Sequence, residues 1–219
     1  MVAQEQVHEE KQDQASGESL AAPQISLEDY MEHYAAQHYE WVEGVLIPMT
    51  PATLKHNDLL YYFHTLLHTY FTLQTIGRVI GQPFVIRLPE SPNRRREPDL
   101  LVVLASNPNT LTVTHMDGAP DICIEIVSEE STARDHGEKF AEYEAGGVSE
   151  YWIIDSVRHE ARFYRLNAEK RYIRQNEDAA GNYTSPALPG LVLHVPTLWA
   201  EKLPDPIATV SAVKTMLEQ

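Results

Sequence analysis

The sequence contains a single cysteine among its 219 residues, Cys123, so no disulfide can form within the chain. Such cysteine usage is typical of proteins in a reducing compartment. The sequence also lacks an apolar run long enough to span a membrane. Residues 1–24 contain no apolar stretch of the kind found in secretory signals. We therefore expect a cytoplasmic protein with no membrane partner.

Positive charge is also scarce. Lys and Arg number 17 against 32 Asp and Glu, which gives a formal net charge of -15 and an isoelectric point of about 5.0. Broad, non-specific nucleic-acid binding normally needs a basic face, so this composition disfavours it. A local basic cleft is still compatible with the composition, because exposed charges more than about 10 Å apart are largely screened in physiological salt.

Composition divides the chain into three parts. Residues 1–24 are polar and rich in Gln and Glu, which predicts a disordered acidic N-terminal tail. Residues 25–200 carry the apolar patterns of one domain with a substantial core. Residues 201–219 are predicted to be a C-terminal extension with a short helix.

The strongest periodic signal lies in residues 53–75, where apolar side chains recur at three- and four-residue spacing and predict a long helix. Two apolar runs, 99–104 and 122–127, predict buried strands. A helix over 132–146 and a further strand over 148–155 follow. This strand–helix–strand passage requires a crossover and at least one parallel pair. The predicted class is therefore α/β or α+β, with a mixed sheet.

Two carboxylates lie in these apolar strands. Asp99 opens the first run, directly after Pro98, and Glu125 lies inside the second. A buried charge without a partner is costly, so metal coordination would explain both carboxylates. The alternatives are that Asp99 simply starts a strand after Pro98 and that Glu125 forms a structural ion pair. Coordination of Mg²⁺ or Mn²⁺, with Lys139 close by on the following helix, would suit phosphodiester hydrolysis, because the cation neutralises the phosphate and delivers a water.

Three further residues join this hypothesis. Residues 40–49 predict two short strands with a turn at Glu43, which is a candidate third ligand, directly or through water. His56, near the start of the long helix, is a candidate contact for a phosphate or the water. Asp135 lies four residues before Lys139 and could hold its side chain in place. Each also has a structural interpretation. Glu43 could be a solvated turn residue, His56 a solvated or capping histidine, and Asp135 a member of a surface ion pair with Lys139.

The basic stretch nearest to Asp99 in the sequence is Arg94, Arg95 and Arg96. Such a stretch can contact the phosphates of DNA, so these arginines are candidate DNA-binding residues. Charges at a sheet edge also protect it from aggregation, and both interpretations stay open here. For a second basic stretch, over residues 158–174, edge protection is the favoured interpretation.

Taken together, these residues resemble the Uma-two family of restriction endonucleases, within the PD-(D/E)XK nuclease superfamily. The match covers roughly residues 25–195. The stretches that carry it are Glu40-Trp41-Val42-Glu43-Gly44, His56, Glu97-Pro98-Asp99-Leu100, Ile124-Glu125-Ile126-Val127-Ser128, Asp135 through Lys139, Tyr143, and residues 147–155.

The resemblance implies a restriction-endonuclease-like core, a central mixed β-sheet flanked by helices. It also implies Mg²⁺ at Asp99 and Glu125 with help from Glu43, Lys139 as the catalytic lysine, and DNA as the substrate. The usual lysine of the superfamily lies two residues after the glutamate, where this chain has Val127, so the helix must supply it. Because double-strand cleavage usually needs two sites, a two-fold homodimer is a further expectation.

Four functions stay open at this point. A Mg²⁺-dependent DNA endonuclease is the leading hypothesis. The alternatives are a non-catalytic, nuclease-derived binding or regulatory module, which the acidic composition favours slightly, and a metal-dependent hydrolase of small phosphorylated molecules. The fourth is a structural scaffold in which Glu125 pairs with Lys139.

Overall fold

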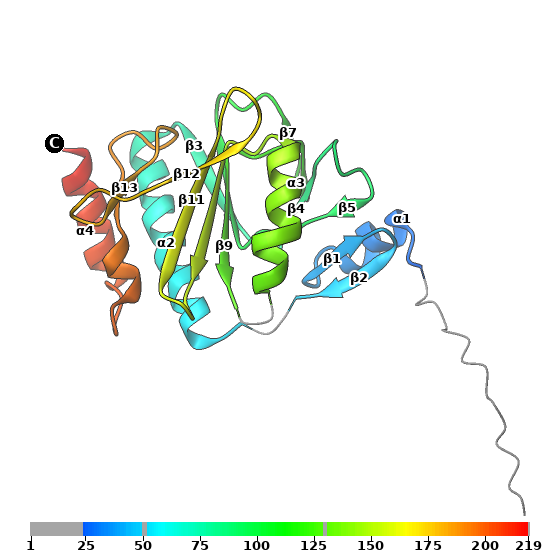
Figure 1. The fold of residues 1–219 in the computed structure, drawn as a ribbon, viewed down its shortest axis with the longest axis horizontal. Helices are drawn as coiled ribbons and strands as arrows, with labels where there is room; N and C mark the ends of the chain where they lie inside the picture. Colours follow the sequence, from blue (N-terminus) through cyan, green and yellow to red (C-terminus); the bar gives the residue numbers. More distant parts are fainter. Residues whose placement is uncertain (1–23, 50–51, 129–130, 219) are drawn as a thin grey trace, which may run out of the picture.

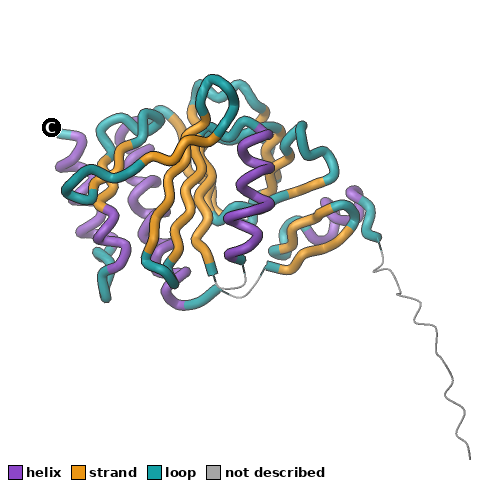
Figure 2. Tube along the Cα trace, in the orientation of Figure 1, coloured by secondary structure: helices purple, strands orange, loops and turns teal. Residues whose placement is uncertain are grey.

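The centre of the protein is a six-stranded sheet (Figure 2). The structure is a computed structural model that describes residues 24–49, 52–128 and 131–218. In the sheet, β9 (Ile122–Val127) and β10 (Glu150–Asp155) run parallel and the other neighbouring strands run antiparallel. In spatial order the strands are β12 (Tyr172–Gln175), β11 (Glu160–Leu166), β10 (Glu150–Asp155), β9 (Ile122–Val127), β6 (Leu100–Leu104) and β3 (Gly77–Gly81).

Helices α2 (Leu54–Gln74), α3 (Lys139–Gly146) and α4 (Pro206–Leu217) cover the two faces of this sheet (Figure 1). The alternation of side chains along β9 divides the core between them: Ile122 and Ile124 pack on the side of α2 and α4, whereas Cys123 and Val127 pack on the side of α3. The mixed sheet flanked by helices confirms the predicted fold class.

The long helix predicted from apolar spacing is α2. Thr53 caps its start by accepting a hydrogen bond from the backbone N–H of His56. One face of α2 is buried in the core through Leu59, Phe63, Leu66, Leu67 and Tyr70.

The predicted helix near the C-terminus is α4, which Asp205 caps. Val213 of α4 is fully buried in the same core as α2. Although residues 201–219 were expected to be an extension, this helix therefore forms part of the main core.

The crossover between the parallel strands supplies the helix that faces Glu125. After β9, the chain forms a π-helical turn, η2 (Arg134–Glu138), which continues directly into α3. Gly147 ends α3 with a φ of 82°, a left-handed conformation that glycine adopts without strain. The chain then enters β10 beside β9, as the sequence predicted.

Smaller elements surround this core. The predicted hairpin around Glu43 is confirmed, although the two- and three-residue strands β5, β7 and β8 were too short to predict.

No described helix is both long and apolar enough to cross a membrane. The predicted tail lies outside the described residues except for Gln24. The remaining elements are α1 (Leu27–Asp29), η1 (Tyr30–Tyr34), β1 (Tyr39–Val42), β2 (Val45–Pro48), β4 (Val85–Arg87), β5 (Arg94–Arg95), β7 (Thr110–Leu111), β8 (His115–Asp117), β13 (Asn182–Thr184), β14 (Val192–His194) and η3 (Val195–Trp199).

Candidate active site

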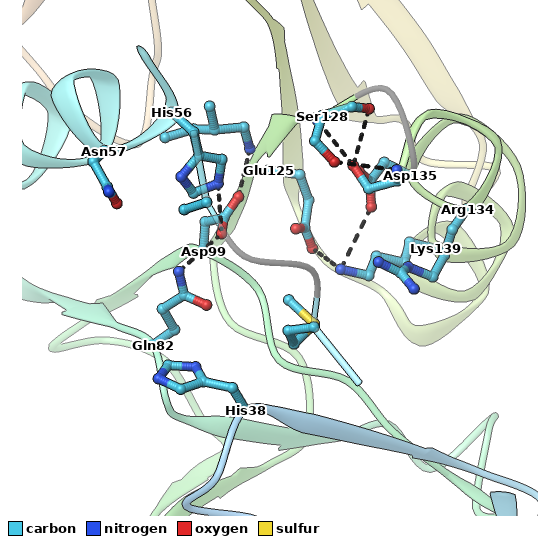
Figure 3. A pocket seen from close by; sticks show the side chains of 14 residues that line it. His38, His56, Asn57, Gln82, Asp99, Glu125, Ser128, Arg134, Asp135 and Lys139 are labelled. Atoms are coloured by element: carbon cyan, nitrogen blue, oxygen red, sulfur yellow. Dashed lines mark hydrogen bonds and ion pairs between the residues drawn. The ribbon is translucent and has the colours of Figure 1, made fainter. Parts of the chain in front are cut away.

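A pocket of about 320 Å³ lies where β9 ends, between the start of α2 and the turn η2 (Figure 3). Five of the nine sequence-predicted site residues line it. They are His56, Asp99, Glu125, Asp135 and Lys139, and Arg134 and His38 add further basic side chains.

Asp99 and Glu125 meet through the register of two neighbouring strands. Leu100 of β6 lies opposite Ile124 of β9, and the next position of this antiparallel pair places Asp99 opposite Glu125. The Oδ2 atom of Asp99 accepts a hydrogen bond of 2.6 Å from the backbone N–H of Ile126. The two predicted carboxylates therefore lie on the same face of the sheet, which is the face covered by α3.

The other oxygen of Asp99 contacts α2 and the loop after β3. Its Oδ1 atom lies 3.3 Å from Nε2 of His56 and accepts a hydrogen bond of 3.2 Å from Nε2 of Gln82. Burial lowers the pKa of His56, but the hydrogen bond and the charge of Asp99 outweigh this and raise it above its usual value. His56 is thus favoured in its protonated form and orients Asp99.

Lys139 reaches the same place from α3. Its Nζ atom lies 2.9 Å from Oε1 of Glu125, 3.1 Å from Oε1 of Glu40 and 3.5 Å from Oδ1 of Asp135. Burial would lower the pKa of Lys139, yet these three carboxylates raise it above its usual value. The ammonium group is 1% exposed at its side chain and stays charged. The predicted meeting of Asp135, Glu125 and Lys139 is present.

Glu125 is a buried carboxylate close to both positive and negative groups. Its Oε1 atom accepts hydrogen bonds of 2.9 Å from both Lys139 and the hydroxyl of Tyr143. Burial raises the pKa of Glu125 well above its usual range, Lys139 opposes this, and the charges of Asp135, Asp99 and Glu40 raise it further. Additional positive charge beside Glu125 would therefore stabilise its ionised form.

The structure contradicts the prediction that Glu43 lies at this site. Glu43 occupies the turn between β1 and β2 with a φ of 53°, and its side chain is 64% exposed. Its carboxylate pairs with Arg94 at 3.1 Å. Glu43 therefore lies outside the pocket that Asp99 and Glu125 line.

Glu40, three residues before Glu43, is the glutamate of this hairpin that reaches the buried ion-pair cluster around Lys139. Its side chain is fully buried, and its oxygens contact Lys139, Nη1 of Arg96 at 2.9 Å and the backbone N–H of Glu97 at 3.2 Å. Burial raises the pKa of Glu40, but Lys139 and Arg96 lower it below its usual value overall. The argument that singled out Glu125, a carboxylate within a strand, would also have found Glu40.

The arginine stretch is not the predicted DNA-binding surface. Arg96 is buried and donates hydrogen bonds to Glu40, Glu138 and Glu142. Arg95 is buried too, over the ring of Trp41. Arg94 pairs with Glu43 and Glu142. The three guanidinium groups neutralise carboxylates or pack inside the protein, because β5 draws this loop against β1.

Arg96→Met should therefore act on stability. It strands the buried carboxylates of Glu40 and Glu142, so we expect the free energy of unfolding to fall by about 3–5 kcal/mol in urea denaturation. Arg171→Met is the control, because the 72% exposed side chain of Arg171 forms a surface pair that contributes about 1 kcal/mol at most. An Arg96→Met protein with wild-type stability but weakened DNA binding would restore the original interpretation.

The donor set suits a hard divalent cation. Across the described residues, no three His, Cys, Asp or Glu side chains are arranged to hold a metal ion. Asp99 and Glu125 instead form a pair of oxygen donors at one pocket. Mg²⁺ typically takes one or two protein carboxylates and completes its shell with waters and substrate phosphates, so the pair fits this ion.

Comparison with known proteins gives the family. The model of Uma2, described as "Putative restriction endonuclease", matches residues 27–196. The chain belongs to the Uma2 family. Membership confirms the resemblance drawn from the sequence, and it places the chain among nuclease-like proteins.

A solved structure with the same fold is a "putative nuclease belonging to DUF820" from Anabaena variabilis ATCC 29413. It is 19% identical to this Uma2 chain, with a TM-score of 0.66 over 80% of this chain and 97% of that one. At this identity the likeness shows the fold alone. A search of curated proteins found no match to the sequence.

Proposed function

We propose that this protein is an endonuclease that hydrolyses DNA phosphodiester bonds with Mg²⁺ or Mn²⁺. The supporting observation is the convergence of Asp99 and Glu125 from two neighbouring strands, with Lys139 at 2.9 Å from Glu125. Membership of the Uma2 family supports nuclease chemistry. DNA as the substrate and the two-fold homodimer remain predictions.

Asp99 and Glu125 are the residues that would hold the cation. When bound, Mg²⁺ supplies charge neutralisation at the phosphate and makes a water more acidic. The chain itself fixes the two carboxylates. The N–H of Ile126 and the ring of His56 orient Asp99, whereas Lys139 and Tyr143 orient Glu125. Such fixed partners keep ligand oxygens in place for catalysis.

Lys139 acts as a fixed positive charge in this proposal. Its raised pKa makes it a poor general base, because it does not release a proton near neutral pH. Its ammonium group instead stabilises the negative charge that develops on the phosphate and can donate a hydrogen bond to the attacking water. Asp135 and Glu40 position it from two sides.

Cleavage of supercoiled plasmid tests the proposal. Nicked or linear DNA should appear with Mg²⁺ or Mn²⁺, and chelation with EDTA should stop the reaction. A purified, folded protein that leaves the plasmid intact with both metals would contradict the proposal.

Glu40 and Glu43 should differ sharply in this assay. Glu40→Gln loosens the position of Lys139, and loss of such a supporting group typically costs about 10–100-fold in activity. Glu43→Gln removes an exposed carboxylate outside the pocket and should leave the initial cleavage rate unchanged. A slower initial cleavage rate in Glu43→Gln with a wild-type rate in Glu40→Gln would assign Glu43 to the site in place of Glu40.

The net charge of -15 favours a second candidate function, a nuclease-derived module that binds without cutting. Calorimetric titration with Mn²⁺ distinguishes the two. The endonuclease should bind Mn²⁺ at the Asp99–Glu125 pair, whereas a folded, non-cleaving protein that binds no Mn²⁺ would support the module.

A further inference from the structure

Arg134 has hydrogen-bonding capacity that the described parts of the chain do not use. Its side chain lines the pocket, is 18% exposed, and makes no hydrogen bond to another described residue. Oε2 of Glu40 lies 3.8 Å from its Nε atom, which allows charge attraction but is too long for a hydrogen bond. A guanidinium group carries five N–H donors, so Arg134 can still bind a ligand.

The other cations at this end of the molecule are already engaged. Lys139 is 1% exposed and enclosed by Glu125, Glu40 and Asp135. His56 contacts Asp99. Arg96 donates hydrogen bonds to the buried carboxylates of Glu142 and Glu40. Arg134 is therefore the strong cation of the pocket lining with donors available to an anion.

The position of Arg134 fits this role. It begins the turn η2, just after the strand that carries Glu125. Figure 3 shows Arg134 and Lys139 together on one side of Glu125, with Asp99 and His56 on the other side. A group bound against Glu125 would thus have Asp99 on one flank and the guanidinium of Arg134 on the other.

We propose that Arg134 binds the non-bridging oxygens of the phosphodiester in this pocket. The proposal rests on the proposed function for its substrate class, a nucleic-acid backbone. Asp99, Glu125 and Asp135 make the lining repulsive to an anion, so a phosphate needs a cation from the protein in addition to a metal. The planar fork of arginine matches two phosphate oxygens, which a lysine cannot reproduce.

DNA binding is the first test. Ca²⁺ replaces Mg²⁺ in this experiment, so that an oxygen-binding cation is present without the ion that the proposed cleavage uses. A fluorescently labelled duplex is titrated with wild-type protein, Arg134→Gln and Arg134→Lys over a range of salt concentrations. Arg134→Gln should weaken binding about tenfold and reduce the slope of log affinity against log salt by about one. Arg134→Lys should keep the slope and recover part of the affinity.

Arg171→Gln is the matched control. Arg171 precedes β12, next to the end of β11, at the end of the sheet opposite the pocket. Its substitution should leave affinity and salt slope unchanged. Thermal unfolding of each variant shows whether it is folded, and a purely structural role for Arg134 would move the unfolding temperature without changing the salt slope.

A second readout separates this proposal from the endonuclease itself. The dinucleoside phosphate TpT is titrated into ¹⁵N-labelled protein, and the Nε–H signal of Arg134 is followed by NMR. If that signal shifts but the plasmid stays uncut, phosphate binding by Arg134 is supported and the proposed endonuclease activity is overturned. If Arg134→Gln cleaves plasmid and binds DNA at wild-type levels, the proposed role of Arg134 is overturned and the endonuclease proposal stands. A wild-type protein that neither binds TpT nor cuts DNA would overturn both.

Discussion

Asp99→Asn should abolish metal-dependent DNA cleavage. The substitution removes one of the two charges that would hold the cation, and charge stabilisation by a metal is worth several kcal/mol, so the rate should fall about a thousandfold or more. The amide oxygen of Asn can still accept the hydrogen bond from the N–H of Ile126. The protein should therefore stay folded while the initial rate of plasmid nicking with Mg²⁺ drops to background.

Asp121→Asn provides a closely matched control. Asp121 also accepts a hydrogen bond from a backbone N–H in the sheet, that of Leu104, at 2.7 Å. It precedes β9, at the end opposite the pocket, and does not line it. This variant should cut DNA at the wild-type rate. Cleavage by Asp99→Asn at the same rate as Asp121→Asn would remove Asp99 from the active site.

Lys139→Met should produce a large loss of stability. One ammonium group compensates Glu125, Glu40 and Asp135, and removing one partner of a buried ion pair typically costs about 3–5 kcal/mol. Urea denaturation measures the loss. Adding Glu125→Gln to the same chain removes a stranded charge and should recover part of the stability, without restoring cleavage.

The loss in Lys139→Met should also depend on pH. The pKa of Glu125 in the folded protein is raised above its ordinary value of 4.5 by burial and by like charges. Without Lys139, only the hydrogen bond from the hydroxyl of Tyr143 to Glu125 opposes that shift. Because the folded state then binds a proton more tightly than the unfolded state, stability should fall as pH rises above about 4.5. A urea midpoint that is higher at pH 8 than at pH 5 would contradict this assignment.

Lys139→Arg separates the chemical role from the structural one. A scaffold in which Glu125 merely pairs with Lys139 would also be destabilised by Lys139→Met. Arginine keeps the positive charge but not the compact ammonium group, so Lys139→Arg should stay closer to wild-type stability while cleavage falls. Full cleavage by Lys139→Arg would mean that only the charge matters at this position.

The sequence predicted the elements that depend on repeated local patterns. The spacing of buried residues in α2 and the apolar runs of β6 and β9 each extend over five or more residues, so their period is visible without the fold. The meeting of Asp99, Glu125 and Lys139 was also predictable, because buried charges must find partners. Strand register and the crossover helix then leave few places for them to meet.

The failures concern side chains whose direction depends on tertiary contacts. Glu43 was predicted as a ligand and Glu40 was not, although the hairpin tip faces solvent and the strand position faces the core. Of the arginines near Asp99 in the sequence, Arg95 and Arg96 are buried and Arg94 pairs with carboxylates, because the two-residue strand β5 lies against β1. Arg134, which lines the pocket, carried no pattern beyond a single charge before Asp135.

The most direct measurement of the central claim is anomalous diffraction from crystals soaked in Mn²⁺. We expect a peak between the carboxylates of Asp99 and Glu125, within coordination distance of an oxygen from each, with Lys139 beside Glu125. An ordered pocket without such a peak, in crystals that bind Mn²⁺ elsewhere on the protein, would contradict the assignment of this pair as the metal-binding centre.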